Sequence, residues 1–214
     1  MKGAIFDIDG TILDSMTIWT DITDEFFKSH GVAITPEENA AYQQLAFEES
    51  LLAIHRDYLS DIPVEEMLDE FSHIAAKAYK NTIQPKPYVC QYIKKLHDSG
   101  VKLAVATSGF DELVEAAFKR IGIFDYFSAF AYSAEVGCSK SSPDIYLLAA
   151  KRLDLKPQEC TVYEDIITGI MSAKNAGFMT VSVADLTNAG DKDRLIQCSD
   201  RYITGWDELL SNIS

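Results

Sequence analysis

The chain has 214 residues, of which 47% are hydrophobic and 24% charged, as is typical of a folded globular protein. This length allows one large domain or a domain that carries a smaller insertion. The formal net charge of −14 disfavours nucleic acid and anionic membrane surfaces as partners, because the chain would repel both. An anionic substrate would need a local positive site, which a divalent metal ion can supply.

The cysteines are widely spaced, with no C-x-x-C pair and no histidine at zinc-finger spacing; they are Cys90, Cys138, Cys160 and Cys198. This spacing excludes a cysteine zinc site and a disulfide framework, and it predicts reduced, mostly buried thiols. No stretch is long enough to cross a bilayer. Asp7 and Asp9 interrupt the N-terminus before an apolar signal region can form. We expect a cytoplasmic protein that is a monomer or a weak oligomer.

The first predicted element is a buried strand, because the apolar run Ala4-Ile5-Phe6 leads into Asp7 and Gly10 ends it. Alternate residues of an extended chain point the same way, so Asp7 and Asp9 can face one crevice. In open α/β sheets, ligands bind in the crevice at the carboxyl ends of the strands. Two buried carboxylates this close need a cation or a proton. For this stretch alone, a solvated acidic turn is an equally good interpretation.

The pattern then becomes helical from Ser15, which is placed to cap the first helix, to about Lys80. The apolar spacing predicts four helices, over 15–29, from 35, over 47–59 and from 62. Beyond Pro85 and Pro87 the chain alternates between helix and strand. Strands are predicted over 102–106, 128–132, 161–163, 179–183 and 201–203. Helices are predicted over 88–99, 112–121, 143–153, 166–176 and 206–210.

This alternation predicts an α/β fold, in which a Rossmann-like, doubly wound parallel sheet is covered by helices on both faces. The helical block interrupts the alternation after the first strand. We expect a core domain formed by residues 1–14 and 82–214, and an all-helical cap domain formed by residues 15–81. An insertion at the carboxyl end of a strand lies at the ligand-binding edge, so it is placed to act as a lid.

Polar residues that could carry chemistry follow four of the predicted strands or their loops; they are Asp7 with Asp9, Thr107 with Ser108 and Gly109, Lys140, and Glu164 with Asp165. Acidic groups, a hydroxyl and a cation suit phosphoryl transfer, where catalysis is mainly positioning and neutralisation of oxygen charge. Taken singly, each group has an ordinary explanation. Thr107-Ser108-Gly109 could form an ordinary strand-to-helix turn, and Lys140 could be a surface lysine. Glu164-Asp165 could cap the following helix.

Four motifs in the same order resemble the haloacid dehalogenase-like hydrolase superfamily. They are F-D-I-D-G-T (6–11), A-V-A-T-S-G (104–109), Lys140 with Pro143-Asp144, and V-Y-E-D-I-I-T-G-I (162–170). The sequence is similar to the branch with a helical cap after the first motif, which includes β-phosphoglucomutase and small-molecule phosphatases. Ser141 departs from the usual proline of the third motif. The dehalogenases proper lack the second aspartate of the first motif, so the presence of Asp9 argues against carbon–halogen cleavage.

The resemblance implies a nucleophile, Asp7, that forms an aspartyl-phosphate, and an acid and base, Asp9. It implies Mg²⁺ held by Asp7, Asp165, Glu164 and the backbone carbonyl of Asp9. Lys140 would pair with phosphate and restrain Asp7. Thr107 would donate its hydroxyl to the phosphate, together with the N–H groups of Ser108 and Gly109.

The expected activity is Mg²⁺-dependent release of phosphate from a small metabolite such as a sugar phosphate. Candidate substrate residues are Ser15, Trp19, Gln43 and Gln44, although core packing is an ordinary role for Trp19. A phosphomutase of the β-phosphoglucomutase type is the nearer alternative. Trp19 stands where that enzyme has a cap histidine, and 42–49 contains no arginine. The more distant alternative is a non-enzymatic phospho-receiver, which is much shorter and lacks the helical insertion.

Overall fold

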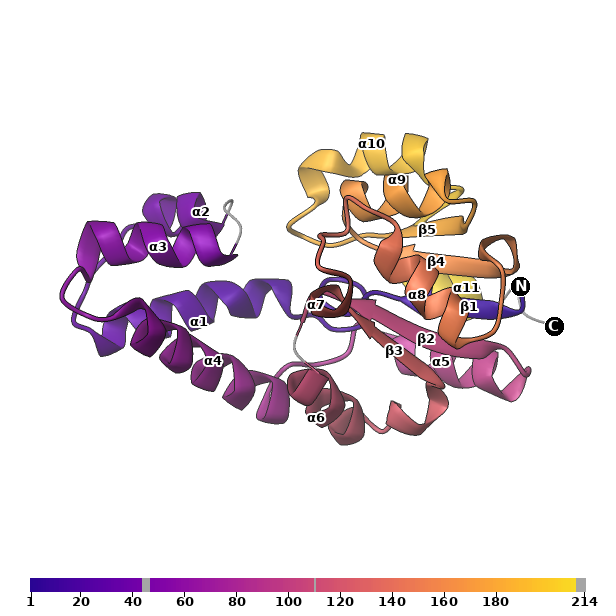
Figure 1. The fold of residues 1–214 in the computed structure, drawn as a ribbon, viewed down its shortest axis with the longest axis horizontal. Coiled ribbons are helices and arrows are strands. Elements are labelled where there is room, and N and C mark those ends of the chain that lie inside the picture. The colour runs from indigo at the N-terminus through magenta and orange to yellow at the C-terminus, as the bar shows by residue number, and fades with distance from the viewer. Residues whose placement is uncertain (44–46, 110, 211–214) are drawn as a thin grey trace. The chain divides into compact units, whose positions relative to one another are not determined.

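The computed structural model describes residues 1–43, 47–109 and 111–210 (Figure 1). The chain divides into two compact units, one of Met1–Met16 with Ile83–Ser214 and one of Thr17–Thr82. We call the first the α/β unit and the second the helical unit. The inserted range expected from the sequence, 15–81, differs from the second unit by two residues at its start and one at its end.

The α/β unit contains a six-stranded parallel sheet in the order β3-β2-β1-β4-β5-β6. The strands are β1 (Gly3–Phe6), β2 (Lys102–Thr107), β3 (Ala129–Tyr132), β4 (Cys160–Glu164), β5 (Met179–Val183) and β6 (Arg201–Ile203). The order reverses between β1 and β4, which lie side by side at the centre. The predicted Rossmann-like α/β fold is confirmed, and its ligand crevice lies at such a reversal.

Helices and short 3-10 turns connect the strands of this unit. The helices are α5 (Val89–Asp98), α6 (Asp111–Ile121), α7 (Ser133–Val136), α8 (Asp144–Arg152), α9 (Ile167–Asn175), α10 (Lys192–Cys198) and α11 (Asp207–Leu210). The 3-10 turns are η1 (Phe124–Tyr126), η2 (Pro157–Glu159) and η3 (Ala189–Asp191).

Alternate residues of β1 bury opposite faces of the sheet. Ile5 belongs to a core cluster that includes Tyr146 of α8. Phe6 points the other way and stacks on Tyr163, with ring centroids 4.6 Å apart, in an aromatic cluster that also contains Trp206. The two clusters cover both faces of the strand, which explains why its sequence is continuously apolar rather than alternating.

The helical unit contains the four predicted helices: α1 (Met16–Ser29), α2 (Pro36–Gln43), α3 (Phe47–Tyr58) and α4 (Val64–Asn81). Phe26 of α1 packs on Phe71 of α4, with ring centroids 4.2 Å apart. The predicted start of α2 is confirmed by a reciprocal cap, in which the Thr35 backbone N–H donates to Glu38 and the Glu38 N–H donates to the Thr35 hydroxyl.

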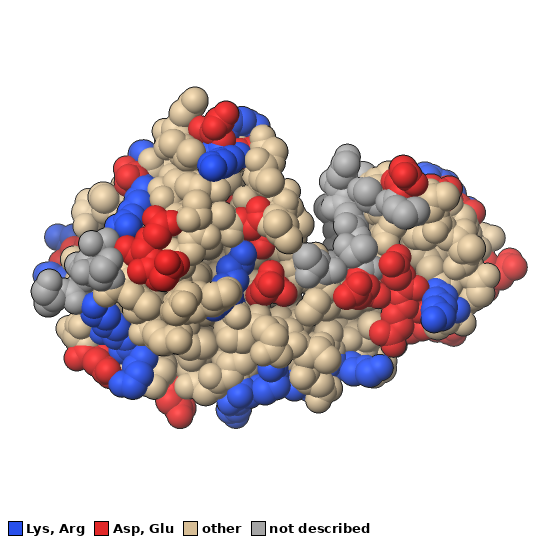
Figure 2. Space-filling model, turned by 180° about the vertical axis from the view of Figure 1, so that it is seen from behind, with Lys and Arg blue, Asp and Glu red and all other residues tan. Residues whose placement is uncertain are grey.

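Acidic and basic side chains are interspersed over the face shown in Figure 2. All four thiols are free; Cys160 is buried and the other three are half-buried, so the expectation of mostly buried thiols holds in part. Among the described helices, none has the length and apolar character needed to cross a membrane.

Candidate active site

A tight turn after β1 places the first two aspartates. The Ile8 carbonyl accepts hydrogen bonds from the backbone N–H groups of Ile12 and Leu13, both at 2.8 Å. Gly10 adopts a φ of +79°, which an L-residue seldom takes. A Cβ at Gly10 would also lie 2.5 Å from Asp165 Oδ2. Glycine is therefore required here twice, once for the turn and once to admit the Asp165 carboxylate.

Three buried carboxylates meet at the carboxyl ends of β1 and β4. Asp7, Glu164 and Asp165 each offer an oxygen within 4.8 Å of the others. The Thr11 hydroxyl donates to Asp165 Oδ1 at 3.2 Å. Asp7 and Thr11 lie more than 150 positions before Glu164 and Asp165 in the sequence, and the pairing of β1 with β4 brings them together.

Lys140 supplies the cation in this cluster. Its Nζ donates to Asp7 Oδ1 and, at 2.7 Å, to Glu164 Oε1. The Lys140 carbonyl accepts from the Ser172 hydroxyl of α9 at 2.6 Å, which holds the loop ahead of α8. Lys140 is 6% exposed, so the surface-lysine interpretation does not apply.

Glu164 has a further partner that the sequence did not indicate. The Tyr146 hydroxyl of α8 donates to Glu164 Oε1 at 3.0 Å, and the Asp165 N–H donates to Glu164 Oε2 at 2.8 Å. Gly169 leaves room for this contact, because a Cβ there would lie 2.6 Å from the Tyr146 oxygen. In the sequence, Tyr146 fits the apolar periodicity of a helix, so this periodicity alone could not reveal the hydrogen bond of its hydroxyl.

Asp9 is not one of the three carboxylates that meet at the strand ends, and it is half-buried. Its Oδ1 accepts a hydrogen bond from the Ser15 hydroxyl at 2.6 Å. The sequence predicts Ser15 to be a candidate substrate residue of the helical insertion. The structure places it in the α/β unit, fully buried and bonded to Asp9.

Thr107 is the last residue of β2, which pairs with β1, and Ser108 and Gly109 form the loop that follows. Thr107 is buried, and its hydroxyl accepts from the Gly109 N–H at 3.0 Å. The Ser108 hydroxyl lies 3.0 Å from that of Ser133. A Cβ at Gly109 would be 3.8 Å from Asp9 Oδ2, so this loop runs beside the Asp9 carboxylate.

The remaining candidate substrate residues belong to the helical unit. Trp19 lies in α1 and Gln43 is the last residue of α2. Gln44 lies outside the described residues.

Burial dominates the electrostatics of the cluster. It raises the pKa of Asp7 to about 8, with a further contribution from the charge of Glu164, while Lys140 opposes the shift. Burial, Glu164 and Asp7 raise the pKa of Asp165 well above its usual range. Burial acts the same way on Glu164, but the charge and hydrogen bond of Lys140 outweigh it and lower the Glu164 pKa. One ammonium thus compensates one carboxylate, and the other two still need a cation or protons.

This donor set fits Mg²⁺. All three side chains offer oxygen, the ligand atom that Mg²⁺ prefers, and their buried charge exceeds that of Lys140. Gly10 leaves open the space beside Asp165 that a side chain would fill. Asp7, Asp165 and Glu164 are therefore the residues that could hold the ion.

Without metal ions, the thermal stability of the protein is expected to fall as the pH rises from about 5 to about 8. The Asp7 pKa is about 8 in the folded chain and near its ordinary 3.8 when unfolded, so the folded state binds more protons between these values. Melting temperatures in chelator across this range test the expectation. Asp7→Asn should flatten the slope, and a wild-type melting temperature that rises steadily with pH would contradict it.

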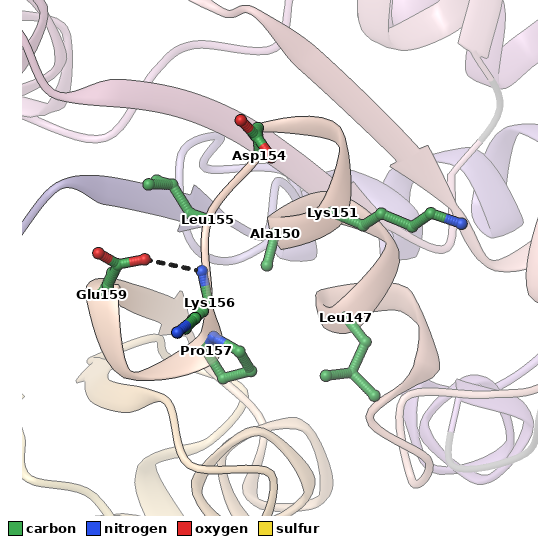
Figure 3. Close-up of a pocket in the computed structure, with 8 residues that line it drawn as sticks. All are labelled: Leu147, Ala150, Lys151, Asp154, Leu155, Lys156, Pro157 and Glu159. Atoms are coloured by element: carbon green, nitrogen blue, oxygen red, sulfur yellow. Dashed lines mark hydrogen bonds between the residues drawn. The ribbon is translucent and has the colours of Figure 1, made fainter.

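A separate surface pocket of about 360 Å³ lies between α8 and η2 (Figure 3). Its wall includes Pro157 and Glu159 of η2, which directly precedes the first residue of β4. Glu164 is the last residue of that strand. The pocket therefore opens at the amino edge of the sheet, opposite the carboxylates, and takes no part in this site.

Known proteins that are similar to this chain show the family to which it belongs. The family described as haloacid dehalogenase-like hydrolase matches residues 1–177. The chain is 30% identical over 185 residues to hexitol phosphatase A of Escherichia coli K12, covering 85% of this chain and 82% of that protein. It is 28% identical over 181 residues to the fructose-1-phosphate phosphatase YqaB of the same organism, covering 85% and 95%.

Among solved structures, CbbY from Rhodobacter sphaeroides in complex with phosphate matches with a TM-score of 0.80 and 24% identity. The alignment covers 100% of this chain and 99% of that one, and at this identity it shows a shared fold. Together with the family match over most of its length, this shows that the chain is an enzyme of the haloacid dehalogenase-like hydrolase family.

Proposed function

We propose that the protein is a Mg²⁺-dependent phosphatase that releases inorganic phosphate from a small phosphorylated metabolite through an aspartyl-phosphate on Asp7. The observation that supports it best is Lys140, held between Asp7 and Glu164 with Asp165 in the same buried cluster. A carboxylate is a weak nucleophile toward an anionic phosphoryl group, so the site must first neutralise charge. Sugar and polyol phosphates are the favoured substrates, because two of the named relatives are phosphatases of this class.

In the first step, a carboxylate oxygen of Asp7 attacks phosphorus and the bond from phosphorus to the leaving oxygen breaks. Asp9 gives its proton to that oxygen, and the product is an aspartyl-phosphate. Lys140 and the Thr107 hydroxyl bind oxygens of the phosphoryl group, with the N–H groups of Ser108 and Gly109. A bound Mg²⁺ would supply further positive charge to the phosphoryl oxygens.

In the second step, Asp9 takes a proton from water, whose oxygen attacks the same phosphorus. The bond to Asp7 breaks, phosphate leaves and the Asp7 carboxylate returns. The surroundings of Asp9 suit it to both steps. The hydrogen bond from Ser15 to Oδ1 fixes its carboxyl group, and its half-buried position keeps that group accessible.

Asp9→Asn is expected to lower kcat by about 10²-fold, the usual contribution of a general acid and base. Asp14→Asn is the matched control, because Asp14 is an exposed carboxylate five residues further along the same turn and should leave kcat unchanged. Phosphate release at saturating Mg²⁺ measures both variants. Equal rates for wild type and Asp9→Asn would exclude the assigned role.

Activity against a panel of sugar and polyol phosphates, with Mg²⁺ and with chelator, tests the function itself. Phosphate release that needs the metal supports a phosphatase. Interconversion of phosphate isomers without net release would identify a mutase, and a phosphoprotein that persists without turnover would identify a receiver.

A further inference from the structure

The side chain of Asn188, between β5 and η3, is bound to the backbone of Asp165. Its Nδ2 donates to the Asp165 carbonyl at 2.8 Å and to the Val183 carbonyl at 3.2 Å. Its Oδ1 accepts from the Asp185 N–H at 3.0 Å. A side-chain amide has two N–H donors and one carbonyl acceptor, so each of these groups is engaged. We propose that Asn188 is a positioning residue that fixes the Asp165 carboxylate for metal binding, an inference that rests on the proposed function.

The link from this backbone contact to the carboxylate is short. An aspartate side chain has two rotatable bonds, so its direction follows closely from the backbone that carries it. Thr11 already bonds one Asp165 oxygen, and Gly10 leaves the space beside the other. Asn188 adds a third constraint, which acts on the backbone of Asp165 rather than on its side chain. It links the Asp165 carbonyl to the end of β5.

The loop that carries Asn188 is itself held firmly. Asp185 Oδ1 accepts from the backbone N–H of Thr187 at 2.9 Å and from its hydroxyl at 2.7 Å. Asp185 Oδ2 forms an ion pair with Lys86 at 2.7 Å, and the Lys86 Nζ also donates to the Ala184 carbonyl at 3.0 Å. The side chains of Lys86 and Asp185 are only 12% and 3% exposed. Breaking such a buried pair costs more free energy than breaking a surface pair, because it leaves an uncompensated buried charge.

Partners that orient metal ligands typically contribute 10- to 100-fold to metal affinity or activity. Asn188→Ala is therefore expected to weaken metal binding about tenfold. The measurement titrates Mn²⁺ alone into each protein, follows the free ion by its EPR signal, and then displaces it with Mg²⁺. No substrate is present, so the affinity is obtained independently of catalysis.

Asn39→Ala is the matched control. Asn39 is another buried asparagine, whose amide donates to Asp24 in the helical unit at 2.6 Å. Its loss should lower the melting temperature and leave the metal affinity unchanged. Asn188→Ser, whose side chain is too short to reach the Asp165 carbonyl, repeats the comparison if the alanine variant does not fold.

Tenfold weaker binding of both ions in the Asn188 variant, with wild-type affinity in Asn39→Ala, supports the assignment. Wild-type affinity in the folded Asn188 variant overturns it and leaves the proposed function intact. Wild-type protein that binds neither ion overturns the proposed metal site, and the positioning role falls with it.

Discussion

Asp7→Asn is expected to reduce kcat by on the order of 10⁴-fold or more, because loss of a covalent nucleophile removes the route through the intermediate. The amide keeps the shape of the carboxylate and an oxygen that can accept from Lys140. It also removes one negative charge from a buried cluster in which three carboxylates share one ammonium. Phosphate release measured with excess enzyme gives the residual rate.

A melting curve of the same variant separates lost chemistry from lost structure. Because the substitution relieves charge repulsion, the metal-free melting temperature should equal or exceed that of the wild type. Retained turnover within tenfold of wild type would remove Asp7 from the nucleophile role. A large fall in melting temperature would show that the Asp7 charge stabilises the fold, contrary to the raised pKa.

Lys140→Met is expected to lower kcat by on the order of 10³-fold, because it removes a donor aimed at the phosphoryl oxygens. It should also lower stability by about 3–5 kcal/mol in the absence of metal, since Asp7 and Glu164 lose the cation between them. Methionine retains the length of the side chain and so limits cavity formation. Kinetics and denaturant unfolding, each with and without Mg²⁺, measure the two effects.

Mg²⁺ should recover part of the stability of this variant and little of its activity. Lys151→Met is the control, because Lys151 is exposed on α8 and the same substitution there should change neither quantity. Equal stability of Lys140→Met and Lys151→Met in chelator would contradict the charge balance described for the cluster.

The sequence predicted the alternating strands, the four inserted helices and the strand-end residues, because each has a strong local signal. The apolar runs 4–6 and 161–163 predict strands, and Asp7 and the pair Glu164-Asp165 follow them directly, while Gly177 marks the end of a helix. The short helices α7 and α10 were not predicted. α7 has only four residues, and α10 lies in a polar stretch whose one buried residue is Leu195, so neither has a periodic apolar face.

Three hydrogen bonds of the site could not be predicted from local sequence signals. Tyr146 and Asn188 reach Glu164 and Asp165 across 18 and 23 residues, through the packing of α8 and the turn after β5. Ser15 looks like an ordinary helix cap in the sequence, yet its hydroxyl bonds to Asp9. Such roles depend on tertiary geometry, which composition and spacing do not encode.

Trapping the covalent intermediate tests the central claim most directly. Wild-type protein is mixed with Mg²⁺ and a substrate from the panel, quenched with borohydride and analysed by peptide mass spectrometry. Borohydride reduces an acyl phosphate to an alcohol, so an aspartyl-phosphate becomes homoserine. We predict this conversion at Asp7 alone, and only when substrate and Mg²⁺ are both present. Phosphate release with an unmodified Asp7, or with the label on another residue, would contradict the account.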